Sequence, residues 1–139
     1  MQVTIAKSFF TKMDSLSARV SEVVKEKATE IISDAVDLSP VDTGAFVESW
    51  QINPRGDRTA RSRTSAGRPR LPEGAKQAKR EEEKARLIGR VESFDMKDLK
   101  GFTITNRAPH LEFIERNPNI KPPFKRPSEI GAILRNKHT

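Results

Sequence analysis

The chain has 139 residues, 35% of them hydrophobic and 32% charged, with a formal net charge of +7, which predicts a thin core and a polyanionic partner or surface. This length allows one domain with one core, and the absence of cysteine excludes disulfides, thiolate nucleophiles and cysteine metal sites. The N-terminal segment holds only a brief apolar run, so we expect neither a secretory signal nor a membrane span.

The first predicted element is a long amphipathic helix over residues 4–37. Its apolar residues recur at steps of three and four and share one face, with most charged residues on the other side. At about 1.5 Å per residue this helix would be roughly 50 Å long, which is too long for a small sheet to cover. We therefore expect its excess length to pack against a neighbouring subunit. Two shorter helices that bend near Ser15 and Ser17 are the alternative.

A turn over residues 39–44 ends this helix. Pro40 has no N–H group and removes the preceding residue from helical geometry. Asp42 and Thr43 offer side-chain oxygens to the turn, and Gly44 allows a positive φ. The turn therefore separates a helix from whatever follows it.

A strand is predicted over residues 45–53. Phe46 and Trp50 are an even number of residues apart, which predicts that they share one strand face. Trp50 is the only tryptophan. We expect it to lie in the core, because a lone aromatic side chain on a strand usually faces the helix that covers the sheet. An interface position is the alternative.

Residues 55–72 are predicted to form a mobile basic loop, because this stretch is rich in Gly, Pro, Ser and Thr and almost free of apolar residues. Within residues 55–70, six arginines stand against one aspartate, a net charge of +5. The arginines are Arg55, Arg58, Arg61, Arg63, Arg68 and Arg70. Arginine contacts phosphate with a planar fork, so nonspecific contact with DNA is one interpretation. A solvated loop that orders against acidic residues of a neighbouring protein is the other.

Four further elements are predicted after the loop. They are a helix from Pro72 to about Phe94, a strand over Phe102–Asn106, a short helix or turn over Leu111–Arg116, and a last short helix over Ser128–Lys137 with Ser128 as its N-cap. Four prolines between residues 118 and 127 favour an extended segment before this last helix. We expect this segment to lie across an adjacent subunit or partner.

The predicted fold is therefore α+β: one domain over residues 1–139, in which a long N-terminal helix packs on a small antiparallel sheet. A second helix follows the basic loop, and an extended C-terminal arm occupies residues 117–139.

No constellation of residues indicates catalysis. The two histidines, His110 and His138, are far apart in the sequence, so a zinc site is not expected. His110 lies beside Glu112 and Glu115, but no second such group is near, and ordinary packing or a subunit contact is our interpretation. We expect no enzyme activity, no catalytic residue, no metal and no cofactor. A small hydrolase would need a nucleophile and a base that the sequence does not pair.

The order of these motifs resembles the neck or tail-completion proteins of tailed bacteriophages, a group of head–tail joining and minor tail proteins. In that family a helix precedes a proline and Asp-Thr-Gly turn, a tryptophan follows soon after, and an Asn-x-Ala-Pro segment leads to a glutamate. The matching positions are Pro40, Asp42, Thr43, Gly44, Trp50, Asn106, Ala108, Pro109 and either Glu112 or Glu115. The resemblance covers roughly residues 5–54 and 86–127. Arg116-Asn117-Pro118 stand where many members have a glycine-containing turn.

The resemblance implies a virion structural protein without enzyme activity, a ring-forming tail-completion component of the neck or head–tail connector. Its implied partners are further copies in a homo-oligomeric ring, other neck, portal-adaptor or tail proteins, and packaged DNA in nonspecific contact. It would reside in the host cytoplasm during assembly and then in the virion. A nonspecific DNA-binding basic protein is the alternative function, carried by the six loop arginines.

Overall fold

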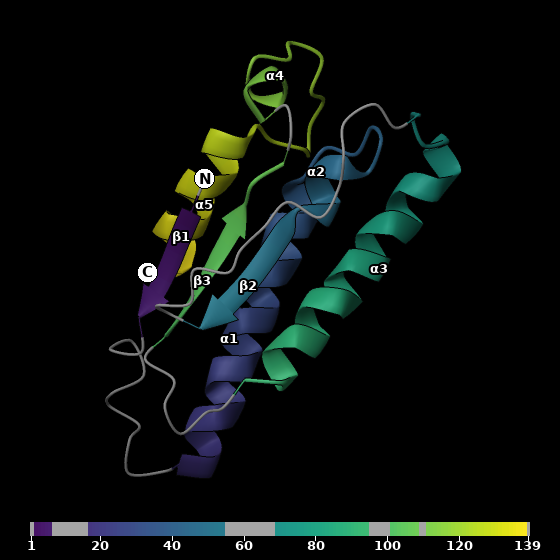
Figure 1. The fold of residues 1–139 in the computed structure, drawn as a ribbon. Helices are drawn as coiled ribbons and strands as arrows, with labels where there is room; N and C mark the ends of the chain where they lie inside the picture. Colours follow the sequence, from purple (N-terminus) through teal and green to yellow (C-terminus); the bar gives the residue numbers. More distant parts are fainter. Residues whose placement is uncertain (1, 7–16, 55–68, 95–100, 109–110, 139) are drawn as a thin grey trace.

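The computed structural model describes residues 2–6, 17–54, 69–94, 101–108 and 111–138. Within these residues it has five helices and one three-stranded antiparallel sheet, so the predicted α+β class is confirmed. In chain order the elements are β1 (Gln2–Ala6), α1 (Ser17–Leu38), α2 (Ala45–Glu48), β2 (Trp50–Pro54), α3 (Glu73–Glu92), β3 (Gly101–Asn106), α4 (Leu111–Glu115) and α5 (Pro127–His138). Figure 1 shows the sheet lying over α1, with α3 beside β2 and α5 beside β1.

The sheet has the strand order β1-β3-β2 and presents two different faces. Val3 and Ile52 both lie opposite Ile104, so apolar side chains from all three strands share one face. The other face carries polar side chains such as Thr4 and Thr103, whose hydroxyl oxygens are 3.2 Å apart. The apolar face is therefore the one that packs against α1.

Residues 2–6 form strand β1, so the prediction of a single helix over residues 4–37 is wrong at its N-terminal end. Val3, Thr4 and Ile5 are β-branched, which favours a pleated surface over a helix. Pairing with β3 supplies the partner that such a short strand needs. The helix α1 begins at Ser17, near the break of the two-helix alternative, and residues 7–16 lie outside the described part of the chain.

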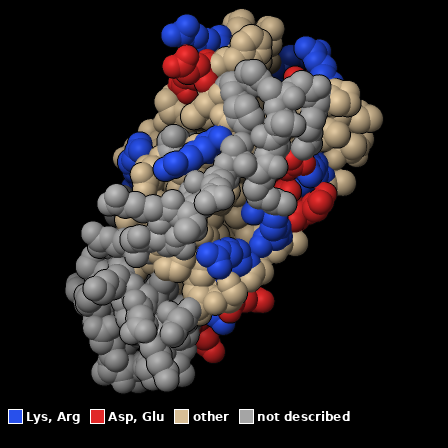
Figure 2. Space-filling view, in the orientation of Figure 1, with Lys and Arg blue, Asp and Glu red and all other residues tan. Residues whose placement is uncertain are grey.

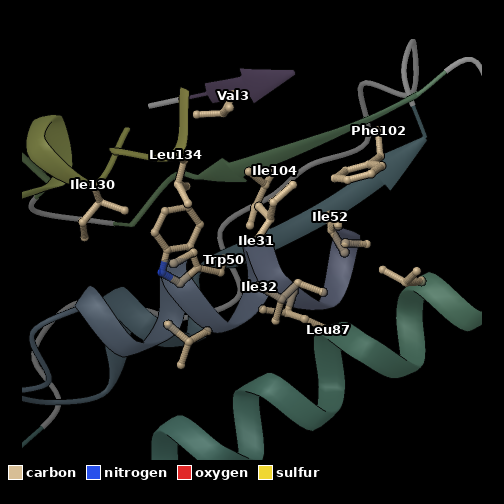
Figure 3. Packing of buried hydrophobic residues seen from close by; sticks show 14 of the residues in the cluster. Val3, Ile31, Ile32, Trp50, Ile52, Leu87, Phe102, Ile104, Ile130 and Leu134 are labelled. Atoms are coloured by element: carbon tan, nitrogen blue, oxygen red, sulfur yellow. The ribbon is translucent and has the colours of Figure 1, made fainter. Parts of the chain in front are cut away.

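One side of α1 is buried in the core of this chain. Its buried residues are Val24, Ala28, Ile31, Ile32, Ala35 and Val36. They pack with Trp50 and Ile104 of the sheet, Leu87 of α3 and Leu134 of α5 (Figure 3). The prediction that Trp50 lies in the core is confirmed. Over these residues the chain covers its own helix, so the core does not need a neighbouring subunit there.

The helix α2 occupies the first half of the predicted strand 45–53, which starts only at Trp50. Gly44 adopts a φ of 91°, as predicted, and the backbone N–H of Glu48 donates to the Gly44 carbonyl at 2.9 Å, which closes a helical turn. Phe46 and Trp50 therefore do not share a strand face. Their rings instead meet edge to face, with centroids 5.8 Å apart.

The elements α3, β3 and α4 lie where the sequence predicts them, within one or two residues. The prediction of an extended arm over residues 117–139 is wrong from Pro127 onward, where α5 begins. The predicted last helix is thus confirmed, and its side chains Ile130 and Leu134 are buried in the core. Ser128 lies within its first turn and is not the N-cap residue.

The segment between α4 and α5 packs on its own chain. The backbone N–H of Lys125 donates to the carbonyl of Leu38 at 2.8 Å, at the end of α1. The ring of Phe124 lies 4.0 Å from the guanidinium carbon of Arg80 on α3. This segment therefore has an anchor on α1 and another on α3, and its predicted contact with a neighbouring subunit stays a prediction.

Candidate functional site

The turn after α1 is fastened to the sheet by Trp50. Its indole Nε1 donates to Ser39 Oγ at 2.8 Å, and this hydroxyl in turn donates to the carbonyl of Ala35 at 2.6 Å. Both side chains are fully buried, so each hydrogen-bonding group has found a partner inside the protein. The position of the motif tryptophan thereby sets the position of the motif turn.

Asn106 fastens the second motif block to the first. It lies opposite Trp50 in the register of β2 and β3. Its side-chain Nδ2 donates to the Phe46 carbonyl at 2.8 Å, and its Oδ1 accepts from the backbone N–H of Ala108 at 3.0 Å. An amide side chain offers both the donor and the acceptor that this arrangement uses. We call Ser39, Phe46, Trp50, Asn106 and Ala108 the motif framework.

Thr43 and Gly44 start the helix α2. The backbone N–H of Ala45 donates to Thr43 Oγ1 at 3.2 Å, which satisfies a donor that the helix leaves free. The positive φ of Gly44 turns the chain into the helix. Pro40 and Asp42 precede them on the same turn, so the first motif block orients α2 relative to the end of α1.

An apolar groove of about 380 Å³ lies beside this turn, at the end of the molecule that carries α4 in Figure 1. Its lining residues are Pro40, Asp42, Thr43, Ala45, Phe46, Phe113, Ile114, Asn117 and Ile120. Phe113 is 73% exposed, the single exposed large hydrophobic side chain among the residues that the structure describes. Three of the motif positions thus line the groove, and the motif framework fixes the wall formed by the turn and α2.

The two candidate glutamates of the motif differ in role. Glu115 accepts hydrogen bonds from the backbone N–H of Ser128, at 2.9 Å, and from the Ser128 hydroxyl. Its carboxylate therefore sits at the N-terminus of α5, where negative charge is favourable. Glu112 is exposed. Pro109 and His110 lie outside the described residues.

Of the six loop arginines, the structure describes Arg70 alone. Its Nε lies 3.3 Å from Asp42 Oδ1 in an exposed ion pair. The backbone N–H of Leu71 donates to the Asp42 carbonyl at 2.7 Å. Asp42 therefore holds the end of the basic loop against the motif turn. Arg55, Arg58, Arg61, Arg63 and Arg68 lie outside the described part of the chain.

Sequence reasoning missed Arg80, which is buried on α3. Its Nε and Nη2 donate to the Ser39 carbonyl at 3.3 and 3.1 Å. Burial lowers the pKa of Arg80 below its ordinary value, although Asp37 and Glu73 act in the opposite direction. The signal was present, because Arg80 lies one heptad before the buried Leu87 on the same helix face.

A buried carboxylate on α3 was also missed. Glu83 Oε2 lies 2.5 Å from Arg86 Nε, and its Oε1 lies 3.6 Å from Lys79 Nζ. Arg86 Nη2 donates to the carbonyls of Trp50 and Glu48, at 2.7 and 3.3 Å. Arg86 therefore satisfies the last carbonyl of α2 and the first carbonyl of β2.

The C-terminal end of α5 is attached to α1 by ionisable groups. His138 is buried, with its Nε2 2.6 Å from Asp34 Oδ2, and Lys137 Nζ lies 2.9 Å from the same oxygen. Burial raises the pKa of Asp34, but hydrogen bonds from Lys137 and His138 outweigh it and hold the pKa below its usual value. We call Asp34, Lys137 and His138 the C-terminal latch.

Among the described residues, no group of three or more His, Cys, Asp or Glu side chains is placed to hold a metal ion, and no described helix is long and apolar enough to cross a bilayer. No protein-family model, curated protein or solved structure matches the chain.

Proposed function

We propose that the chain is a virion structural protein of a tailed bacteriophage, a ring-forming tail-completion component of the neck or head–tail connector. The observation that carries this proposal is the convergence of the motif residues at one end of the molecule. Residues from both blocks of the resemblance meet there through the motif framework. An apolar groove lies beside them, lined by Pro40, Asp42 and Thr43 of the first block and by Phe113 and Ile114 of the second.

The chemistry of the groove supports a role in assembly. Its lining is mostly apolar, and Phe113 stands exposed at its edge. An exposed aromatic side chain next to an apolar hollow is typical of a protein contact, because aromatic anchors supply much of the binding energy at interfaces. In the proposed assembly this groove contacts the adjacent copy of the chain.

The proposal does not depend on an incomplete core. The apolar side of α1 is covered within the chain over its described residues, and α5 is inserted into the same core. The described core is therefore closed within one chain, and the proposed assembly uses the surface of the subunit. Further proposed partners are other neck, portal-adaptor or tail proteins, in the host cytoplasm during assembly and in the virion afterwards.

Sedimentation velocity of the purified protein, alone and mixed with candidate neck and tail proteins from the same genome, tests the proposal. We expect a discrete ring-sized species in at least one mixture. Phe113→Glu should weaken the association by about tenfold or more, because it places a charge in the contact. Ala85→Glu adds the same charge at an exposed position of α3 and should leave association unchanged.

A wild-type protein that stays monomeric in every mixture would contradict the ring. Equal effects of the two glutamate variants would remove the groove from the contact, since net charge alone would then explain the loss. Both variants need the circular-dichroism spectrum and melting temperature of the wild type for this comparison to apply.

A further inference from the structure

A second surface at the same end of the molecule carries a cluster of cations. Residues 116–126 link α4 to α5, and they contain Arg116, Lys121, Lys125 and Arg126 but no acidic residue. We call this segment the basic strap. Arg116, Lys121 and Arg126 are exposed and Lys125 is half-buried. Figure 2 shows Lys and Arg side chains on this upper end of the molecule, with acidic side chains beside some of them.

Among the described residues, none of the four cations of the strap takes part in a salt bridge. The pKa of Glu73 is lowered mainly by its hydrogen bond to Lys76, whose Nζ lies 2.6 Å from Glu73 Oε1, and to a smaller extent by the charge of Lys121. The strap therefore presents four cations that have no direct ion-pair partner among the described residues.

Several lysines on the helices do form ion pairs. Lys79 lies 2.5 Å from Glu48, Lys84 lies 2.6 Å from Asp37, and Lys137 belongs to the C-terminal latch. Figure 2 shows positive and negative side chains side by side along the flank of α3. Single unpaired cations such as Lys25 and Arg107 occur elsewhere on the described surface, but the strap brings four of them together within residues 116–126.

The strap is also held in place. The Lys125 N–H bonds to Leu38, the Phe124 ring lies against Arg80, and the Phe124 N–H donates to the Lys121 carbonyl at 3.1 Å. A ligand that binds these cations does not have to order the segment first, which favours affinity.

We infer that the basic strap binds the phosphate backbone of duplex DNA. Lys and Arg are the residues that contact phosphates, whereas lysine is depleted from the centres of protein interfaces. The apolar side chains of the strap, Ile120 and Phe124, are turned to the groove and to Arg80, so its outer surface offers charge without an apolar anchor. This contact does not require the proposed ring, and it places DNA on described residues, in contrast to the arginine loop.

The binding is nonspecific. Four phosphate contacts release counterions, so the logarithm of the association constant should fall with the logarithm of the salt concentration with a slope of about −3.6. Between roughly 50 and 200 mM salt, the strap's contribution to affinity should then fall about 10²-fold.

The test compares two variants with the same change in net charge. The strap variant is Arg116→Gln, Lys121→Gln, Lys125→Gln and Arg126→Gln, and the loop variant is Arg55→Gln, Arg58→Gln, Arg61→Gln and Arg63→Gln. Fluorescence anisotropy with a labelled duplex of arbitrary sequence is measured over a salt series. We expect the strap variant to reduce the salt slope by about 3 to 4 and the loop variant by less than about 1.

Three results would overturn the inference. They are no binding of the wild type at low salt, equal losses in the two variants, and tighter binding to polyglutamate than to DNA, which would indicate an acidic protein as the partner. If the strap variant fails to fold, the triple variant that keeps the half-buried Lys125 replaces it, with an expected slope change of about 2 to 3.

Discussion

The motif framework and the C-terminal latch both fasten distant segments to α1 or its end, but with different kinds of bond. The framework uses neutral donors and acceptors that are fully buried, such as Trp50 Nε1 and the Asn106 amide. The latch uses ionisable groups around Asp34, whose side chain is partly open to solvent. Loss of a framework group leaves buried polar atoms without partners, whereas solvent screens the ion pair of the latch.

We expect the largest loss of stability when Trp50 is replaced. Trp50→Ala should lower the free energy of unfolding by about 3–5 kcal/mol, because it leaves a cavity and removes the donor to Ser39. Trp50→Phe keeps a ring in the core and removes only the donor. This variant should therefore lower the free energy of unfolding by about 1–2 kcal/mol. Urea denaturation followed by circular dichroism measures both. Equal losses would mean that the hydrogen bond, and not packing, dominates at this position.

Asn106 should give the next effect. Asn106→Ala removes the partners of the Phe46 carbonyl and the Ala108 N–H, and we expect a loss of about 2–3 kcal/mol in the same denaturation assay.

Asn106→Asp places an ionisable group in the buried motif framework and so tests the burial of this site. Burial would raise the pKa of the new carboxyl group, so this variant should become more stable as the pH falls and its protonated oxygen can donate to Phe46. A variant whose stability does not depend on pH in the acid range would contradict the burial assigned to this site.

The latch should give the smallest effect. The pKa of Asp34 is lower in the folded protein than the reference value of 3.8, so its stabilising contribution is present above that value and is lost as the pH falls through the folded pKa. Asp34→Asn should lower the free energy of unfolding by about 0.5–1 kcal/mol at neutral pH and remove this part of the acid dependence.

Denaturation at a series of pH values, at low and high salt, measures the effect of the latch. The difference between wild type and Asp34→Asn should shrink at high salt, since Asp34 is partly exposed. If Asp34→Asn lowered the free energy of unfolding at neutral pH by as much as Asn106→Ala, the latch and the framework would not differ as this comparison predicts.

Much of the fold was predictable because it follows local rules. The apolar spacing of α3 and α5, the strand β3, and the turn ending at Gly44 all appear in the sequence as periodicity or as backbone preference. The burial of Trp50 was predictable for the same reason, since a single large aromatic residue favours the core.

The strand β1 and the helix α2 were not predictable in this way. Val3 and Ile5 fit the start of a helical pattern as well as a strand, and only pairing with β3 decides between them. The residues of α2 alternate like a strand, but Gly44 and the Thr43 hydroxyl start a helical turn first. Short segments follow their tertiary partners more than their own propensity.

The candidate site was likewise predictable only in part. The sequence named the residues of both motif blocks, but it did not show that Asn106 bonds to Phe46 or that Phe113 stands beside an apolar groove. Arg80 escaped notice because a charged residue is normally assigned to the surface, and its partner, the Ser39 carbonyl, lies 41 residues away.

The amino-acid sequence by itself determined the mixed helix and sheet class, the positions of α3, β3, α4 and α5, and the charge of the chain, because these depend on composition and on short-range periodicity. Tertiary structure alone decided which charges are neutralised, which side of α1 is covered, and that the two motif blocks meet. Those outcomes depend on contacts between residues far apart in the chain, and no local pattern records such contacts.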